Sequence, residues 1–377
     1  MKCKFGEIAT GFDYGMNAAA KPYDGQNKYI RITDIDEASS TYNNSSIVSP
    51  DGILSENYVV NEGDILLART GASTGKSYLY RKSDGKLYYA GFLIRANVAE
   101  HNPYFVFSQL HTHRYWRWVS IMSARSGQPG INSLEYASFP IFTTTLKEEN
   151  KISSLLSLID ERITTQNKII EKLQSLIKGL SQQLLSSEND WILYRLDDLA
   201  QIKSGYSGTQ VSYQTPYKVS RIETISKHCI DIQRIGYVEC IPESYRLNVG
   251  NILFSNINSI QYIGNTAYLD KDYGLYHGMN LLRIIPNTTI VRPRFLHLLL
   301  CTDWAINYFQ TICNKAVSQA SINQTALGKS RFPIPPMSVQ QQICSMFELT
   351  ERKLDNEQEY ISCLQQQKRY LLQKMFI

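Results

Sequence analysis

The sequence predicts an α+β protein that consists of two similar globular modules, each followed by one long helix. The first observation behind this prediction is an internal repeat, in which an offset of 191 residues relates residues 131–184 to the second half of the chain without a gap. A period this long exceeds the 20–50 residues of solenoid repeats and indicates a duplicated module with pseudo-twofold symmetry. The matched pairs include Ile131 and Ile322, Ile152 and Ile343, Asp160 and Glu351, Ile170 and Ile361, and Leu180 and Leu371.

The second observation is a heptad pattern in each half, with apolar residues at alternating steps of four and three. Such a stripe is typical of a helix that packs against another helix. We expect helices of about 39 residues, roughly 58 Å long at 1.5 Å per residue. Thr145 or a neighbouring Thr is the expected N-cap of the first helix, and Ser338, after two prolines, that of the second. The two stripes run from Ile152 to Leu184 and from Ile343 to Met375.

Each helix has an obvious partner in the other, and the repeat symmetry predicts that they pack antiparallel. Gln166 and Glu357 are related by the offset of 191 and both occupy the apolar stripe near the helix midpoint. We hypothesise that this polar pair fixes the register of the helices, as single polar residues do in coiled coils. The alternative is that both side chains reach out to solvent.

The third observation is the mixture of short strand-like runs and turns before each helix, typical of a globular α+β module. We therefore place the first module at residues 1–147, the central helix at 148–189, the second module at 190–337 and the C-terminal helix at 338–377. The second module has a lead-in from Trp191 to Leu196 that the first module, which begins almost at Phe5, lacks. The strand-like runs lie at residues 29–32, 65–68, 252–254 and 281–284, and helix starts are expected at residues 103 and 294.

Composition and charge are those of an ordinary globular protein, with 43% hydrophobic and 19% charged residues. No apolar run reaches the length of a membrane-spanning helix, so no membrane partner is expected. Seven cysteines without a C-x-x-C pair indicate reduced thiols and a cytoplasmic location. The net charge of +5 is compatible with a nucleic-acid partner but does not require one.

Motifs that suggest catalysis or metal binding are incomplete in this chain, so we expect no catalytic residues, no metal site and no enzyme activity. Residues 71–77 have three residues between their glycines where a phosphate-binding P-loop needs four. Asn102, before a proline, is better interpreted as a helix cap than as part of a methyltransferase signature. His111 and His113 lack a third ligand and are more typical of an exposed, aromatic-rich helix.

Two pairs of polar loops at equivalent places in the two modules are the candidate binding site. The strands before residues 69–76 and 255–262 match, while the loops differ in chemistry, as expected if the modules read different sequences. Arg suits the edge of guanine, Asn and Gln suit adenine, and Lys and Ser suit phosphates. Residues 123–130 and 314–320 form the second pair. The candidate DNA-binding residues are Arg69, Thr70, Ser73, Lys76, Arg125, Gln128, Ser255, Asn256, Asn258, Gln261, Lys315 and Gln319.

With these features in place, the whole chain resembles the specificity subunits of type I restriction–modification systems. The resemblance depends on the order of the parts and on their duplication around two long helices. Its motifs are G-D-I-L-L-A-R-T-G-A-S-T-G-K-S-Y-L-Y at 63–80, I-N-S-L-E-Y-A-S-F-P-I at 131–141, G-N-I-L-F at 250–254 and S-I-N-Q-T-A-L-G-K-S-R-F-P-I-P-P at 321–336.

The resemblance implies two target-recognition domains, each reading half of a bipartite, asymmetric site in double-stranded DNA. It implies that the helices set the spacer between the half-sites and dock two modification subunits, which bind S-adenosylmethionine and methylate adenine. Restriction subunits would add translocation and cleavage that use ATP and Mg²⁺, so this chain itself would hold no cofactor.

Two other functions remain open at this point. A coiled-coil scaffold whose modules bind protein without DNA specificity would show no steep loss of affinity with salt, whereas phosphate contacts make DNA binding strongly salt-dependent. A nuclease or methyltransferase would be active as the purified chain with Mg²⁺ and S-adenosylmethionine.

Phosphate and base contacts predict different results for two substitutions. Lys76→Ala should weaken DNA binding for all sequences alike, because a phosphate contact carries no sequence information. Asn258→Ala should relax discrimination at one position of one half-site. Affinities measured over a panel of duplexes separate the two outcomes. If both variants merely unfold, the assignment of these loops to binding is wrong.

Overall fold

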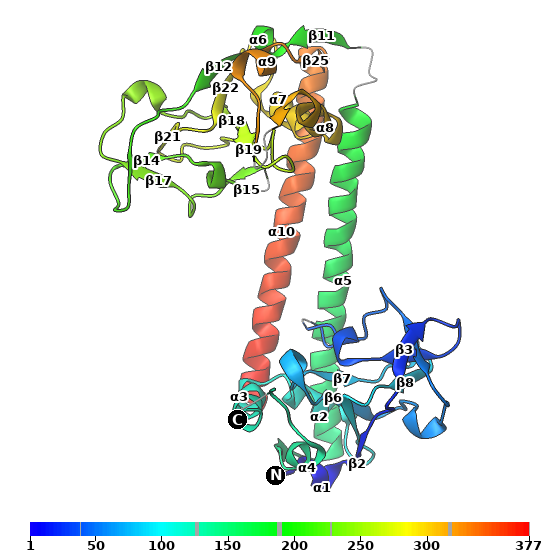
Figure 1. Cartoon of the computed structure of the whole chain (residues 1–377). Helices are drawn as coiled ribbons and strands as arrows, with labels where there is room; N and C mark the ends of the chain where they lie inside the picture. Colours follow the sequence, from blue (N-terminus) through cyan, green and yellow to red (C-terminus); the bar gives the residue numbers. More distant parts are fainter. Residues whose placement is uncertain (38, 125–127, 187–190, 227, 316–318, 377) are drawn as a thin grey trace. The chain divides into compact units, whose positions relative to one another are not determined.

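The computed structural model describes residues 1–377 apart from 38, 125–127, 187–190, 227, 316–318 and 377. The chain forms two compact units, Met1–Asn167 with Glu359–Ile377 and Lys168–Gln358. Each unit contains one globular module together with a segment of each long helix (Figure 1). The helices are α5, Leu146–Leu184, and α10, Met337–Met375, each of 39 residues. The predicted pair of long helices is thus confirmed.

The N-cap of α5 agrees with the sequence, whereas that of α10 does not. The Thr145 hydroxyl accepts a hydrogen bond from the backbone N–H of Glu148 at 3.3 Å. In α10, the carbonyl of Pro336 accepts from the N–H groups of Val339 and Gln340. Because the helix therefore begins at Met337, Ser338 lies inside the first turn and the prediction that it caps the helix is wrong.

Each module is built on a four-stranded antiparallel sheet of the same order in both units. The buried strand that the sequence predicts at residues 65–68 lies inside the first sheet, and its repeat partner at 252–254 lies inside the second. The first sheet has the order β2 (Thr10–Tyr14), β9 (Leu93–Asn97), β6 (Asp64–Ala68) and β7 (Ser77–Leu79). The second has the order β12 (Ala200–Ser204), β22 (Leu282–Pro286), β18 (Ile252–Phe254) and β20 (Thr266–Tyr268).

A short strand at the start of each module pairs with the strand that precedes its long helix. In the first unit β1 (Lys2–Lys4) pairs with β10 (Pro140–Phe142), and in the second β11 (Ile192–Arg195) pairs with β25 (Arg331–Ile334). The helical turns α1 (Phe5–Ile8) and α6 (Leu196–Leu199) follow. Phe5 therefore corresponds to Leu196, so the expectation that the first module lacks a lead-in strand is wrong.

Three further helices occur in the same order in both modules. The second and third of them have the same N-cap residue type in both copies, a threonine and an asparagine respectively, whereas the first has a side-chain cap only in the first module. The Asn102 side chain accepts from the N–H of Phe105, which confirms the predicted cap. The helices are α2 (Pro103–Gln109), α3 (His113–Met122) and α4 (Ser133–Ala137) in the first module, and α7 (Pro293–Leu300), α8 (Asp303–Ile312) and α9 (Gln324–Gly328) in the second.

The segments that connect the sheet strands form a smaller, more divergent layer. Both modules keep one parallel pair there, β4 (Lys28–Ile30) with β8 (Leu87–Tyr89) and β14 (Tyr217–Val219) with β21 (Leu275–Tyr276). The other strands of this layer are β3 (Ala19–Pro22) and β5 (Val48–Asp51) in the first module, and β13 (Gln210–Val211), β15 (Ile225–Ser226), β16 (Cys229–Ile230) and β17 (Gly236–Val238) in the second.

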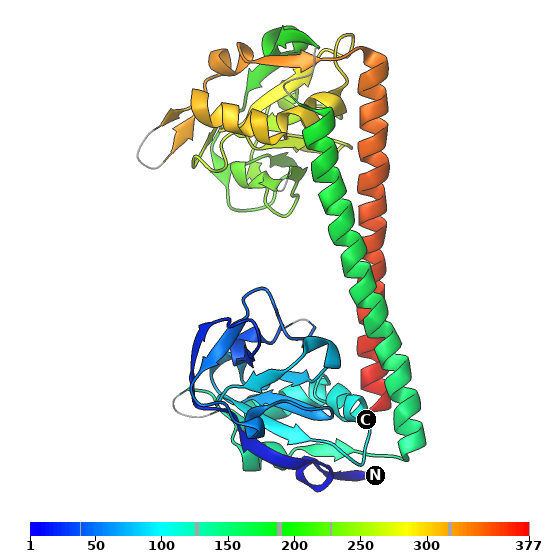
Figure 2. The same cartoon turned by 90° about the vertical axis from the view of Figure 1, so that its right-hand side faces the viewer.

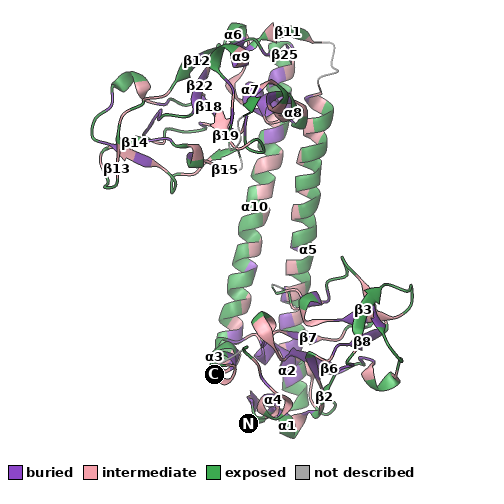
Figure 3. Cartoon of the chain, viewed as in Figure 1, coloured by how far each residue is buried: buried purple, intermediate pink, exposed green. Residues whose placement is uncertain are grey.

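In each unit the module packs against its own segments of α5 and α10, and the buried residues gather at that junction (Figures 2 and 3). The core of the first unit joins Phe5 and Tyr115 of the module to Leu156 of α5 and Leu372 of α10. Asp160 of α5 forms an ion pair with Lys368 of α10 at 2.5 Å. From Leu156 to Asp160 the residue number rises along α5, while from Leu372 to Lys368 it falls along α10. The two segments are therefore antiparallel, as predicted.

The core of the second unit likewise joins its module to both helices. Ile343 and Phe347 of α10 are buried with Phe254 and Phe309 of the module, and Ile177 of α5 packs against this cluster. No helix in the described residues carries an apolar stretch long enough to traverse a lipid bilayer.

The predicted contact between Gln166 and Glu357 involves residues of different units and stays a prediction. Within its own unit, the Gln166 side chain is buried. Glu357 forms an ion pair with Lys353, one helical turn before it. A buried polar residue in an apolar stripe is the feature that the register hypothesis requires of Gln166.

A buried polar side chain on each long helix holds the module in place. In the first unit this residue is Glu149, whose side chain is fully buried. Its carboxylate accepts hydrogen bonds from the backbone N–H groups of Asn102 at 3.0 Å and Thr144 at 3.3 Å. It also contacts the imidazole of His101 at 2.8 Å. Glu149 thereby ties the start of α2 to the first turn of α5.

The repeat partner of Glu149 is Gln340, which makes the equivalent contacts in the second unit. Its side chain, also fully buried, accepts from the N–H of Arg292 at 2.8 Å. Its amide N–H groups donate to the carbonyls of Ile290 at 3.0 Å and Pro335 at 2.9 Å. We call Glu149 and Gln340, with these backbone partners, the buried joints of the two units.

A second pair of acids, one on each long helix, reinforces the joints three helical turns further on. The hydroxyl of Tyr104 in α2 donates to Asp160, and Arg294 in α7 forms an ion pair with Glu351. Asp160 and Glu351 are also related by the offset of 191. The repeat detected in the helices therefore extends to the contacts that attach each module to them.

Substitution of Glu149 by Ala should destabilise the first unit by on the order of 3 kcal/mol, because buried N–H groups would lose their acceptor. Hydrogen exchange of the amides of Asn102 and Thr144 should accelerate in the full-length chain. The neighbouring Glu148, which is exposed, provides the control. Glu148→Ala should change stability by less than about 0.5 kcal/mol. Unchanged exchange in Glu149→Ala would contradict the role of the joint.

Candidate nucleic-acid interface

The two predicted loops of the first module lie side by side. Thr70 forms an isolated antiparallel bridge with Gly130. The N–H of Gly71 donates to the carbonyl of Pro129, and the N–H of Ile131 donates to that of Arg69, both at 2.9 Å. Two segments that are far apart in the sequence are thus held side by side at the end of β6.

The second module joins its two loops in the same way. There β19 (Ile257–Asn258) pairs with β24 (Ala320–Ser321), which also pairs with β23 (Asn314–Lys315). The N–H of Ile322 donates to the carbonyl of Asn256 at 2.8 Å, as Ile131 does to Arg69. This matching bond makes Asn256 the structural counterpart of Arg69.

The candidate residues differ in how far they are available to a ligand. Gln128, Gln261, Lys315 and Gln319 are exposed, while Arg69, Thr70 and Ser73 are partly exposed. Arg125 lies outside the described residues. The exposed residues can meet DNA without a change in the loops, so for them the proposed contacts need only the right orientation.

Lys76 is largely covered, with 19% of its side chain exposed, and its ammonium group forms an ion pair with Glu37 at 3.1 Å. The Glu37 side chain is itself exposed. Because the Glu37 end of this ion pair is screened by solvent, the pair contributes little stability, and a phosphate can replace the carboxylate. The predicted phosphate contact of Lys76 would therefore involve an exchange of partners.

The three candidates at the start of the second-module loop shape that loop. Ser255 is buried, and its hydroxyl accepts from the amide of Asn258 at 3.1 Å. The side-chain oxygen Oδ1 of Asn258 accepts from the backbone N–H of Ser259 at 2.8 Å. Asn256 donates to the carbonyl of Ile322 at 3.3 Å. Direct base contacts by these residues stay a prediction, and they would require these side chains to leave their present partners.

Arg69 is the candidate whose surroundings are most specific. Its guanidinium group lies over the ring of Tyr14, 4.6 Å from the centroid. The Tyr14 hydroxyl accepts from the backbone N–H of Ser133 at 3.3 Å, and hydrogen bonding to Ser133 lowers the pKa of Tyr14. The N–H of Arg69 donates to the carbonyl of Phe92 at 3.0 Å. Backbone and side chain of Arg69 are thus both fixed by neighbours from other elements.

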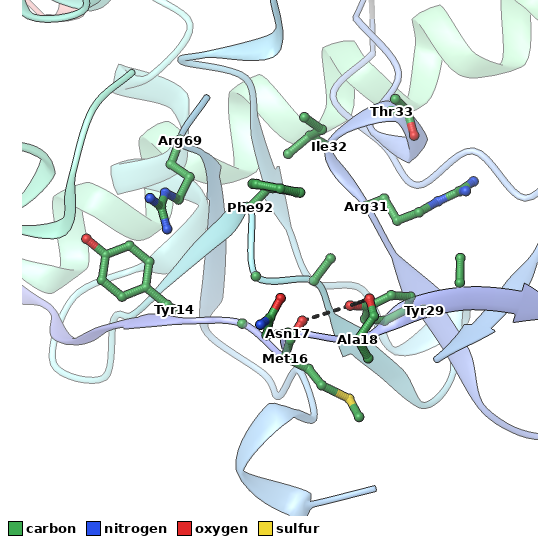
Figure 4. Close-up of a pocket in the computed structure, with 14 residues that line it drawn as sticks. Tyr14, Met16, Asn17, Ala18, Tyr29, Arg31, Ile32, Thr33, Arg69 and Phe92 are labelled. Atoms are coloured by element: carbon green, nitrogen blue, oxygen red, sulfur yellow. Dashed lines mark hydrogen bonds between the residues drawn. The ribbon is translucent and has the colours of Figure 1, made fainter. Parts of the chain in front are cut away.

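Arg69 and Tyr14 belong to a cavity of about 540 Å³ in the first module. Arg69, Phe92 and Arg31 follow one another along its wall, as Figure 4 shows. The guanidinium of Arg31 is held by the carboxylate of Asp34 through bonds of 2.8 and 2.7 Å. Sequence reasoning identified Arg69 but missed Tyr14 and Phe92. The sequence features that could have identified them are an aromatic residue at the end of a strand for Tyr14 and an aromatic residue next to a turn glycine for Phe92.

The histidines at 111 and 113 do not form a metal site. His111 bonds to the Phe107 carbonyl at 3.0 Å and the Ser40 hydroxyl at 2.9 Å. Burial and the nearby Lys368 lower the pKa of His111 to about 4. His113 is exposed at the start of α3, in agreement with the aromatic-rich helix that the sequence predicts. Among the described residues, no group of three His, Cys, Asp or Glu could hold a metal ion.

The second unit contains a larger cavity, of about 1100 Å³, between its module and its helix segments. Several of its polar groups are engaged with one another, since Arg294 is paired with Glu351 and the Cys301 thiol contacts His228 and His297 at 3.3 and 3.4 Å. Burial raises the pKa of Cys301 to about 12, so this thiol stays protonated. The cavity therefore belongs to the attachment of the module to its helices.

Comparison with known proteins finds one family model and two specificity subunits that are similar to parts of this chain. The type I restriction modification DNA specificity domain matches residues 188–366. The putative type I restriction enzyme MjaX specificity subunit of Methanocaldococcus jannaschii is 38% identical over 193 residues, which are 50% of this chain and 45% of that protein. The MjaVIII specificity subunit of the same organism is 23% identical over 76% of this chain and 72% of that protein. The chain thus spans less than half the length of the first of these relatives.

Solved structures share the fold of the whole chain. The crystal structure of the type I restriction–modification S subunit from M. genitalium is 15% identical and has a TM-score of 0.64, with 100% of this chain and 96% of that chain covered. A chain from a structural study of the assembly and conformational transition of the type I R-M system is 16% identical and has a TM-score of 0.61, with 99% and 96% covered. The α+β fold with two long helices, as predicted, is the fold of these S subunits.

Proposed function

We propose that this chain is a non-catalytic specificity subunit that reads a bipartite, asymmetric DNA site. The proposal is supported by the match of residues 188–366 to the type I restriction modification DNA specificity domain. Each module would read one half-site through the loop pair at the end of its central strand. The family resemblance recognised in the sequence is confirmed by the comparisons, and the alternative of a scaffold without DNA specificity is not favoured.

The observation that supports two different half-sites is the combination of a sheet of the same strand order with different side chains at matched loop positions. The backbone bonds that make Asn256 the counterpart of Arg69 also relate Ala68 to Ser255, since their carbonyls accept from Gly75 and Gly264, respectively. At matched positions one module therefore presents a cation with five donors, and the other an amide with donors and an acceptor. The two present different hydrogen-bonding patterns to base edges.

The chemistry would reside in partner subunits. We expect modification subunits that bind S-adenosylmethionine and methylate adenine, and restriction subunits that use ATP and Mg²⁺. The long helices would set the spacer between the half-sites. A cytoplasmic location also stays a prediction from the cysteine usage.

Repeated apolar residues on the exposed helix faces support the proposal of two modification subunits. Leu155 and Leu158 of α5 are exposed in the first unit, and their repeat partners Met346 and Leu349 of α10 are exposed in the second. Two matching apolar pairs at symmetric positions suit two copies of one partner. Exposed apolar pairs on a polar helix surface are typical of protein interfaces.

Methylation by the assembled complex tests the recognition function. Co-expression with the modification subunit, followed by single-molecule sequencing of methylated adenine, should give one motif with two defined halves and a fixed gap. A stable complex that methylates no such motif would contradict the proposal. Binding of the full complex to its motif should weaken steeply with salt, as counterion release requires.

The two apolar pairs predict a change in stoichiometry. Leu158→Glu and Leu349→Glu should each remove about one modification subunit, and the double variant both, because a charge replaces an apolar contact. Native mass spectrometry of the co-expressed complex measures this. Both residues are highly exposed, 58% and 68%, so the fold should tolerate the change. Leu176→Glu is the matched control, since Leu176 is also exposed but its repeat position is Gln367. Full occupancy in the double variant would contradict this docking surface.

A further inference from the structure

We propose that Arg69 reads a guanine in the half-site of the first module and that Tyr14 is the residue that positions it. This inference rests on the proposed DNA-recognition function and assigns a base class to one module. It is argued from the position of Arg69 over the ring of Tyr14, from the cavity beside them and from the ion pair that engages the neighbouring Arg31.

The guanidinium group of Arg69 contacts an aromatic ring but keeps its hydrogen-bond donors available. It stacks over Tyr14 at 4.6 Å, and within the described residues no hydrogen bond or ion pair engages its N–H groups. A contact between a cation and an aromatic ring uses no N–H donor, so the donors of Arg69 remain available to a ligand. The guanidinium donors match the two acceptors O6 and N7 of guanine, the commonest specific contact in protein–DNA complexes.

The support for Tyr14 comes from a different element. The Ser133 N–H at the first position of α4 holds the phenol oxygen, while β2 supplies the backbone of Tyr14. The N–H of Arg69 is held in turn by the Phe92 carbonyl. An arginine whose backbone and aromatic support are both fixed loses less conformational entropy on binding, which favours a directional contact.

The surroundings favour a base edge over a phosphate. Arg31, the other cation of the cavity, donates two hydrogen bonds to the carboxylate of Asp34, whereas Arg69 has no acidic partner among the lining residues. Phe92 is 59% exposed beside it. An apolar ring next to a donor fork suits the base edges of the major groove, where donors meet guanine and apolar groups meet the thymine methyl.

The second module lacks this arrangement, which provides an internal comparison. Asn256 occupies the position of Arg69, and Ser204 ends β12 where Tyr14 ends β2. The Ser204 hydroxyl lies 3.4 Å from the side chain of Gln324, the repeat partner of Ser133. The guanine contact is therefore assigned to the first module alone.

The experiment measures binding of the full methyltransferase complex to duplexes that carry its own motif. Each guanine of the first-module half-site is replaced in turn by 7-deazaguanine, which lacks N7, or by 2-aminopurine, which lacks O6. At one guanine, both analogues should weaken wild-type binding by about 5-fold to 150-fold. The Arg69→Ala complex should bind the natural and analogue duplexes equally, because the lost atoms and the lost side chain belong to one contact.

Two Tyr14 variants separate positioning from direct contact. Tyr14→Phe keeps the ring under the guanidinium and should retain the analogue penalty, whereas Tyr14→Ala should lose it while binding to non-specific DNA is unchanged. Arg117→Ala removes an exposed arginine from α3 of the same module and should leave the penalty intact. Thermal unfolding of each variant verifies that the module is folded.

The outcomes that overturn the inference differ from those that overturn the proposed function. If the complex methylates no bipartite DNA motif, the proposed function and this inference are both wrong. A bipartite motif without guanine in either half, or an analogue penalty that persists in Arg69→Ala, removes the inference alone. A uniform loss of affinity for all duplexes in Arg69→Ala would show that Arg69 contacts phosphate instead.

Discussion

The buried joint between each module and its helix is the constraint on which the rest of the structure depends. Glu149 and Gln340 are fully buried, and each forms hydrogen bonds with backbone groups of the module beside it. A buried polar group is tolerated only in the geometry that completes its hydrogen bonds, so each joint admits essentially one orientation of its module. Apolar packing alone, as in the cluster that contains Leu156 and Leu372, would permit many orientations of the module.

Because each joint fixes its module, the residues that stabilise the fold are different from those proposed to contact DNA. The matched sheets, the threonine caps of α3 and α8 and the two joints are alike in the two units, whereas the loops beyond β6 and β18 are not. Because the core does not depend on Arg69 or Asn256, these positions can vary without loss of the fold. The divergence of two copies within one chain is the expected result when the framework is conserved and the exposed edge is free to change.

The sequence was sufficient for the features that recur at a fixed spacing. The long helices, the central strands at 65–68 and 252–254 and the cap at Asn102 follow from local pattern, and all are present. The Ser338 cap failed because the Pro336 carbonyl can begin a helix as well as a serine can. Proline lacks only a donor, and the first turn needs none from that position.

The elements of the site that the sequence could not supply are those assembled from distant segments. Tyr14, Arg69 and Ser133 meet only because β2, β6 and the start of α4 converge, and no spacing rule links them. Convergence also leaves hydrogen-bonding capacity unused, as in the N–H donors of Arg69 and the buried oxygen of Asn256 that has no partner within the described part of the chain. Folded proteins rarely leave such groups unsatisfied. Both lie at the same position of the repeat, so the copies differ in the group they carry there. The donors of Arg69 can meet a ligand directly, whereas the buried oxygen of Asn256 can do so only after its side chain moves.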